Sequence, residues 1–316
     1  MSSDKVSRFP YPFSSDVYRY SNNSLLLDPP IAIEVTPEYA DEITLKRKLL
    51  ADCHSRCYQS LPHTLQAQWE VVSVVLHHLA ETYPASFTLD KKENLWTFTN
   101  QILNETATFT FGDAGTLPIE PLDFVGRHVQ EDLIVMGQRD NDLFLDAGQL
   151  CFPANWSLQF NLGMNFVEIH TPIPGFSADR LDEKIRNFIM RLENGQPWVR
   201  RNWSLNAGHK LDSSLETFHL WGQKRKEITA ENAGQEVYLR VEVQKLFRLP
   251  RTHAVLFTIH THLISLQELS LNRDYAKQLY HVLVELPDFI ADYKGMKLFR
   301  GQTINYLHNL FNEAGC

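Results

Sequence analysis

Two long β-type runs in the last third of the chain place the strongest limit on its fold. Residues 236–247 and 254–263 both alternate between apolar and polar side chains, and a short segment containing Pro250 joins them. In the first run, Val237, Leu239, Val241 and Val243 occupy alternate positions. A period of two is typical of a strand, so we predict an antiparallel hairpin here.

The remaining pattern places helices and strands in blocks. Helical spacing predicts helices over 39–58, 65–83, 158–166, 181–192, 273–286 and 301–313, and shorter β-type runs occupy 85–89, 95–99, 106–111, 132–136 and 149–152. Blocks of this kind, without βαβα alternation, predict an α+β fold in which helices cover an antiparallel sheet. The sequence also contains neither a GxGxxG nor a GxxxxGK[ST] motif, which argues against a nucleotide-binding fold.

Composition restricts the partners and the compartment. With 316 residues and 43% hydrophobic residues, the chain can form one compact unit with a large core. A formal charge of −8 argues against nucleic acid or an anionic membrane as a partner. We find neither a signal peptide nor an apolar run of about 20 residues. With four scattered cysteines, these observations predict a cytoplasmic protein without a disulfide framework.

The stretch around His170 is the densest in residues that can support chemistry. His170 follows the expected helix over 158–166 and precedes Pro172 and Pro174, which we expect to hold the backbone extended. A neutral imidazole mounted in this way can bind a metal or heme iron through one nitrogen while the other donates to a carbonyl. The alternative is a core histidine with only a structural hydrogen bond.

Three other groups of residues are weaker candidates. Arg200 or Arg201 could hold a carboxylate, and Trp198 and Trp203 could floor an apolar cavity, although a strand with surface arginines and core tryptophans would show the same pattern. Two further pairs lie on expected strands. The side chains of Glu131 and Asp132 face opposite ways, so only one of them could serve a site. His260 and His262 share a face and could bind a metal.

Five motifs in a fixed order carry a resemblance to a known family. They are Glu131-Asp132-Leu133, Phe152-Pro153 with Trp156, Ile169-His170-Thr171-Pro172-Ile173-Pro174, Arg200-Arg201-Asn202-Trp203, and Leu239-Arg240-Val241-Glu242 with Arg248-Leu249-Pro250-Arg251-Thr252. Over about residues 10–300 the chain resembles the heme-dependent oxidative N-demethylase α-subunit family. The resemblance implies a PAS-like, five-stranded antiparallel sheet whose helices enclose a heme. It implies an N-terminal wrap and helices at 1–84, a heme-binding core at 85–270, and C-terminal helices at 271–316 packed on that core.

The resemblance also implies an activity and a set of partners. The family's characterised reaction is the oxygen-dependent demethylation of a small secondary amine such as dimethylamine. Electrons from NADPH pass through partner subunits that carry FMN and a 2Fe-2S cluster, and tetrahydrofolate takes up the one-carbon product. These cofactors are expected only on partners, because this chain has no motif for them. A heme-based gas or redox sensor without turnover is the alternative, and a non-heme protein with a structural His170 is a third possibility.

The resemblance assigns roles to particular residues. It implies that His170 is the proximal iron ligand and that Glu242 and Arg240 face the distal side, where they would polarise oxygen and orient a protonated amine. Residues implied to line the pocket or hold a propionate are Trp156, Arg200, Arg201, Asn202 and Trp203. The sequence departs from the family pattern at Val243, where an arginine is expected, and at His260 and His262, where arginine and tyrosine are expected.

Overall fold

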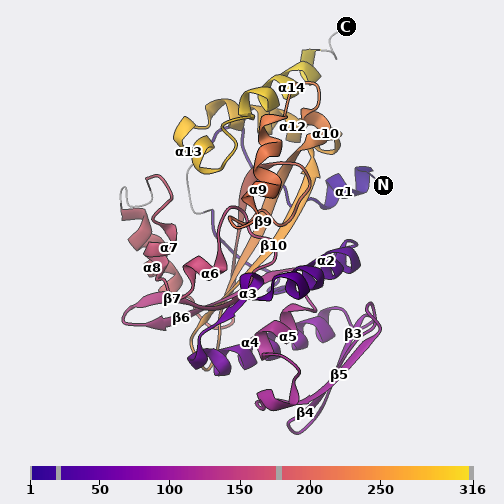
Figure 1. Ribbon diagram of the computed structural model, residues 1–316, viewed down its shortest axis with the longest axis vertical. Coiled ribbons are helices and arrows are strands. Elements are labelled where there is room, and N and C mark those ends of the chain that lie inside the picture. The colour runs from indigo at the N-terminus through magenta and orange to yellow at the C-terminus, as the bar shows by residue number, and fades with distance from the viewer. Residues whose placement is uncertain (1, 19–22, 176–179, 313–316) are drawn as a thin grey trace.

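The computed structural model describes residues 2–18, 23–175 and 180–312 (Figure 1). Its main sheet is antiparallel, in the order β1-β8-β9-β10-β6-β7-β2. The strands are β1 Leu25–Leu26, β2 Tyr58–Ser60, β6 Asp132–Arg139, β7 Asp142–Gln149, β8 Trp198–Ala207, β9 Val237–Arg248 and β10 Val255–Ser265. The expected α+β class is confirmed. Within the described ranges this sheet has seven strands rather than five, but β1 and β2 are short edge strands that the N-terminal part contributes.

The predicted hairpin is confirmed as β9 and β10, which form the centre of the sheet. Glu70, on helix α4 (Leu65–Thr82), holds its turn by accepting hydrogen bonds from the Arg251 and Thr252 amides at 2.7 and 2.9 Å. Directly opposed residues of an antiparallel pair project to the same face. Glu242 opposes Thr261 and Val243 opposes His260, so consecutive residues of β9 serve opposite faces of the sheet.

A second, three-stranded sheet lies at one end of the molecule, and the C-terminal helices lie at the other (Figure 1). Its strands are β3 Phe87–Lys92, β4 Leu95–Asn100 and β5 Glu105–Thr110, which match three predicted runs. The helix predicted over 65–83 is confirmed as α4, and the one predicted over 39–58 is two helices, α2 Tyr39–Asp52 and α3 His54–Cys57. Helix α5 (Pro121–Gly126) packs on α4.

The strand predicted over 149–152 is wrong, because β7 ends at Gln149. The amides of Cys151 and Phe152 donate instead to the Asp132 carboxylate, both at 2.8 Å. A side chain thereby satisfies two amides that a continuing strand would have paired with backbone, and the chain leaves the sheet. This departure leads directly into the helices that cover one face.

Three helices cover that face: α6 Leu158–Asn161, α7 Phe166–His170 and α8 Leu181–Met190. The continuous helix predicted over 158–166 is wrong, because Gly163 has a φ of +82° and interrupts it. Asn165 then starts α7 with a reciprocal capping arrangement involving Glu168. The extended backbone predicted after His170 is also wrong, because the chain turns and the Ile173 amide donates to the His170 carbonyl at 3.0 Å.

The remaining helices lie mainly at the C-terminal end of the chain. They are α1 Ser2–Arg8, α9 Phe218–Trp221, α10 Ala233–Glu236, α11 Leu266–Leu269, α12 Arg273–Glu285, α13 Asp288–Tyr293 and α14 Arg300–Asn312. Helices α12 and α14 confirm the two predicted near the C-terminus. Apolar side chains of α10–α14 pack with one end of β9 and β10, and a separate apolar cluster joins α6–α8 to the sheet. No helix in the described ranges is long and apolar enough to cross a bilayer.

Candidate functional site

A cavity of about 410 Å³ lies between the main sheet and helices α6–α8. Its volume is typical of cofactor and ligand sites in proteins. One part of its wall is apolar and consists of Ile134, Met136, Leu145, Phe166, Ile185, Phe188, Leu246 and Phe257. Another part is polar and consists of Asn155, Asn161, Arg200, Asn202, Asn206, Glu242, Gln244 and Lys294. The cavity can therefore hold a molecule with a large apolar body and charged substituents.

His170, the last residue of α7, lines this cavity. Its Nδ1 is 2.7 Å from the Phe166 carbonyl oxygen, and because a carbonyl can only accept, Nδ1 carries the proton. Nε2 is then the nitrogen with a lone pair for a metal. The pKa of His170 is lowered to about 4, mainly by burial and to a lesser extent by Arg200, against the opposing effect of the Phe166 carbonyl. With a pKa of about 4, the imidazole is neutral at physiological pH.

Two cations lie together at the polar part of the cavity. Arg200 projects from β8 on the same face as Glu242, and Lys294 follows α13. The Lys294 ammonium donates to the Trp203 carbonyl at 2.6 Å and lies 3.4 Å from the Asn202 Oδ1. The pKa of Lys294 is lowered to about 8, mainly by burial and to a lesser extent by Arg200, against the opposing effect of Glu242. The site is therefore suited to anionic groups near Arg200 and Lys294.

Glu242 provides a fixed carboxylate in the same wall. Its side chain is buried and accepts hydrogen bonds from Asn202 at 3.2 Å, Gln244 at 2.9 Å and Arg240 at 3.2 Å. Arg240 is fully buried behind it and does not line the cavity. The Arg240 guanidinium also donates to the Phe152 and Leu211 carbonyls and to Thr261. These contacts make Arg240 a support that orients Glu242.

The residues singled out from sequence divide between the two faces of the sheet. His170, Trp156, Arg200, Asn202 and Glu242 line one cavity. Arg201 and Trp203 also border it, but alternation along β8 directs their side chains to the opposite face. The exposed Arg201 acts electrostatically on Glu34 and His262, and the Trp203 ring packs on Phe13 at 4.9 Å.

The candidate acids Glu131 and Asp132 are buried and line no part of the cavity. Burial raises the pKa of Asp132 to about 6 although Lys46, 3.8 Å away, favours its ionised form. Glu131 lies on the opposite face of the sheet, near His260. Val243, His260 and His262, the three departures from the family pattern, are also absent from the cavity wall.

Several residues of the polar wall were not predicted as site residues from the sequence, and Lys294 and Gln244 are two that contact predicted ones. Lys294 stands between Tyr293 and Gly295 in a polar stretch that resembles an exposed loop, and Gln244 belongs to a strand that was read only for its alternation. The facing pattern of β9 could have identified Gln244, because it shares a side with Glu242. No local pattern marks Lys294, whose position depends on the packing of α13 against β8.

These residues fit a heme. The apolar wall suits a porphyrin ring, the Nε2 of a neutral His170 suits its iron, and Arg200 with Lys294 suits its two carboxylates. Comparison with known families agrees with this chemistry. The model of one family, described as "haem-dependent oxidative N-demethylase, alpha subunit-like", matches residues 26–304, which is most of the chain. The chain therefore belongs to the haem-dependent oxidative N-demethylase, alpha subunit-like family.

Proposed function

We propose that this chain is the heme-binding and substrate-binding subunit of an oxidative N-demethylase for small secondary amines such as dimethylamine. The observation that carries the proposal is one cavity lined by both a neutral histidine, His170, and a fixed carboxylate, Glu242. Such a pair provides an iron ligand and a recognition site for a protonated amine within one enclosure.

Each role follows from the contacts in the cavity wall. His170 would hold the iron through Nε2, because Nδ1 is engaged with the Phe166 carbonyl. Arg200 and Lys294 would pair with the propionates. When bound, the heme would supply oxygen activation by electrons delivered from outside the chain. The apolar wall would exclude water from the reacting groups.

Glu242 would bind the substrate as its ammonium ion. A dialkylammonium carries two N–H donors and a positive charge, and the ionised carboxylate accepts from both. Asn202 and Gln244 donate to Oε2 of that carboxylate and Arg240 donates to Oε1, so its orientation costs little entropy when the amine binds. The neighbouring apolar wall would contact the methyl groups of the amine.

The overall reaction requires partners. Dimethylamine, O2, two electrons and two protons give methylamine, formaldehyde and water. The sequence has no dinucleotide-binding motif, so the electrons would pass from NADPH through partner subunits carrying FMN and a 2Fe-2S cluster, with tetrahydrofolate accepting the formaldehyde. The description "alpha subunit-like" supports a multi-subunit enzyme. A cytoplasmic location stays a prediction from the sequence.

The five longer strands support a PAS-like core. Strands β6 to β10 pair in the order β8-β9-β10-β6-β7, and α6–α8 lie between β7 and β8 in the chain. We propose that these strands with the three helices form the PAS-like heme enclosure. The positions that depart from the family pattern, Val243, His260 and His262, lie outside the cavity wall, which favours retained turnover over a sensor with an altered pocket.

The test begins with purified protein titrated with hemin and followed by its Soret absorption. We expect stoichiometric binding by wild type and by His219→Ala, an exposed matched control, and a strongly shifted or lost Soret band in His170→Ala. An unchanged spectrum in His170→Ala would contradict the assignment of the iron ligand.

Turnover is tested by supplying a chemical reductant, O2 and dimethylamine and measuring formaldehyde. Glu242→Gln should keep the Soret band and lower kcat/KM for the amine by about ten- to a hundredfold, as expected for the loss of a charged hydrogen bond. Formaldehyde production by Glu242→Gln equal to wild type would refute the role of Glu242. A stable oxy complex that is indifferent to amines would identify a sensor.

A further inference from the structure

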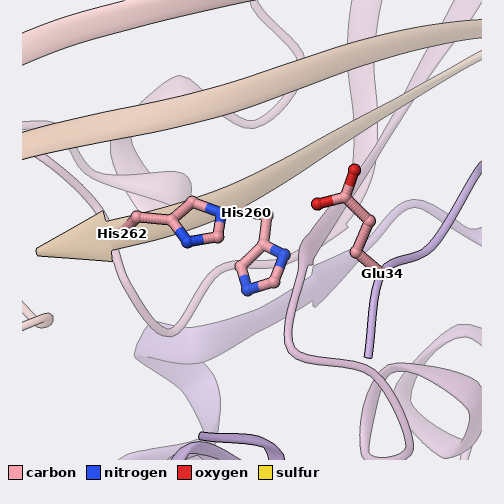
Figure 2. A group of neighbouring side chains, drawn as sticks. All are labelled: Glu34, His260 and His262. Carbon is pink, nitrogen blue, oxygen red and sulfur yellow. The ribbon is translucent and has the colours of Figure 1, made fainter. Parts of the chain in front are cut away.

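The face of the sheet opposite the cavity carries a second group of potential ligands. His260 and His262 project from β10, and Glu34 belongs to an irregular segment, residues 31–35, that crosses this face before α2. Figure 2 shows the two imidazole rings side by side with the Glu34 carboxylate next to them. One ligand atom from each residue lies within 4.8 Å of the other two, which is close enough for all three to reach one ion.

Two nitrogens of this group are buried without a hydrogen bond. His260 Nδ1 and His262 Nε2 find no hydrogen-bond partner among the described residues, and His260 is only 2% exposed. The two rings lie 4.2 Å apart between centroids. Buried polar atoms in folded proteins are nearly always satisfied by protein, water or an ion. The histidine pair therefore indicates a ligand between the rings and Glu34.

The surrounding charges favour a cation. His260 lies 3.5 Å from a Glu131 oxygen and 3.8 Å from a Glu42 oxygen, both beyond ordinary hydrogen-bond distance. Together with Glu34 these are three carboxylates around largely buried imidazoles. Within the described part of the chain, the cations that act on this group include Lys245, which is 3.0 Å from Glu34, the exposed Arg201, and Arg8, which is itself paired with Asp4 and Glu38. Negative charge is in excess, and either a proton or a metal ion can balance it.

We propose that Glu34, His260 and His262 form a binding site for a divalent first-row transition metal, with Zn²⁺ as the representative ion. Two imidazoles and one carboxylate are a ligand set that Zn²⁺ and Fe²⁺ both accept, with at least one position left for water. The bound ion joins the segment 31–35 to β10 and so fastens the N-terminal part of the chain to the sheet. This site does not depend on heme, because the sheet separates it from His170.

Lys245 competes with the metal for Glu34. Its ammonium donates to the Glu34 carboxylate at 3.0 Å and to the Ile31 carbonyl at 2.9 Å. A metal ion of higher charge displaces it from the carboxylate and leaves it on the carbonyl. Removal of the ammonium should therefore strengthen Zn²⁺ binding. If a proton on His260 balanced the carboxylates instead of a metal ion, removal of the ammonium would not strengthen Zn²⁺ binding.

The experiment uses the full chain carrying His170→Ala, so that heme iron does not contribute. The protein is stripped with a chelator and titrated with Zn²⁺ alone by calorimetry, and bound zinc is measured by elemental analysis. We expect one equivalent of zinc per chain and a melting temperature that rises with zinc concentration. His262→Ala and Glu34→Gln should each weaken binding at least tenfold, and exposed His219→Ala should bind as the parent does.

Folding of each variant is checked by circular dichroism, and Lys245→Met provides an independent arm. Tighter zinc binding by Lys245→Met supports the site even if His262→Ala fails to fold. The proposal is overturned if the stripped parent takes up no zinc, or if His262→Ala and Glu34→Gln bind zinc as tightly as the parent. Failure of this site would leave the heme titration of the wild-type chain unaffected, so the two proposals fail separately.

Discussion

The neutral state of His170 makes the heme-free protein sensitive to acid in a predictable way. In the folded chain the pKa of His170 is about 4, against 6.5 for an ordinary histidine. Below pH 6.5 the unfolded chain binds a proton at this position that the folded chain does not bind. The stabilising contribution is therefore fully present above pH 6.5 and is lost as the pH falls toward 4.

The size of the effect follows from the two pKa values. At pH 4.5 a histidine with a folded pKa of about 4 and an unfolded pKa of 6.5 has lost about 2.5 kcal/mol of its contribution to the unfolding free energy. Partial exposure of the ring reduces this to about 2 kcal/mol. The variant His170→Gln lacks the titrating group, and other acid-sensitive groups, such as buried His128, remain in both proteins.

The assay is urea unfolding of heme-free wild type and His170→Gln at pH 7.5 and pH 4.5. Between pH 7.5 and pH 4.5, the unfolding free energy of wild type should fall by about 2 kcal/mol more than that of His170→Gln. The exposed control His219→Gln should respond as wild type does. Equal losses in wild type and His170→Gln would refute the reasoning, because His170 would then be protonated as readily in the folded chain as in the unfolded one.

Three further predictions concern the supports of the cavity and its charge. Arg248→Met should lower the unfolding free energy by about 3–5 kcal/mol, because the Arg248 guanidinium donates to three carbonyls at the end of α8. Denaturant unfolding measures this loss, and the exposed control Arg251→Met should change the unfolding free energy little. Glu70→Gln should lower the unfolding free energy by about 1–2 kcal/mol, because it weakens the hydrogen bonds that hold the β9–β10 turn. The control is Glu81→Gln, an exposed position on the same helix. Wild-type heme affinity should fall by up to about tenfold per pH unit above pH 8, where Lys294 loses its proton; Lys294→Met should bind heme more weakly with no such dependence, and an unchanged pH profile would contradict its role.

Alternation along the central hairpin was the most informative pattern in the sequence. It correctly predicts β9 and β10 and places Glu242 on one face and Val243 on the other. The pattern failed where side chains replace backbone partners, as Asp132 does for the amides after β7. Turn chemistry at Gly163 likewise divided a predicted helix.

The candidate site was only partly predictable for a related reason. His170 could be singled out by its neighbours in sequence, but the cations that line the same cavity, Arg200 and Lys294, come from a distant strand and from the residue after a distant helix. Adjacent Arg200 and Arg201 could not be distinguished without knowing which face of β8 borders the cavity. Glu34 was missed because residues 31–35 have no periodicity, and only the packed structure brings them to His260.

The alternation along β9 and β10 also has an evolutionary consequence. Successive codons of these strands encode side chains for two separate chemical environments, with Glu242 and Gln244 serving the cavity and Val243 and Lys245 serving the histidine cluster. Mutations at alternate positions can therefore accumulate under independent selection, although they are neighbours in the gene. A lineage can gain or lose ligands on one face of the sheet while the residues on the other face stay the same.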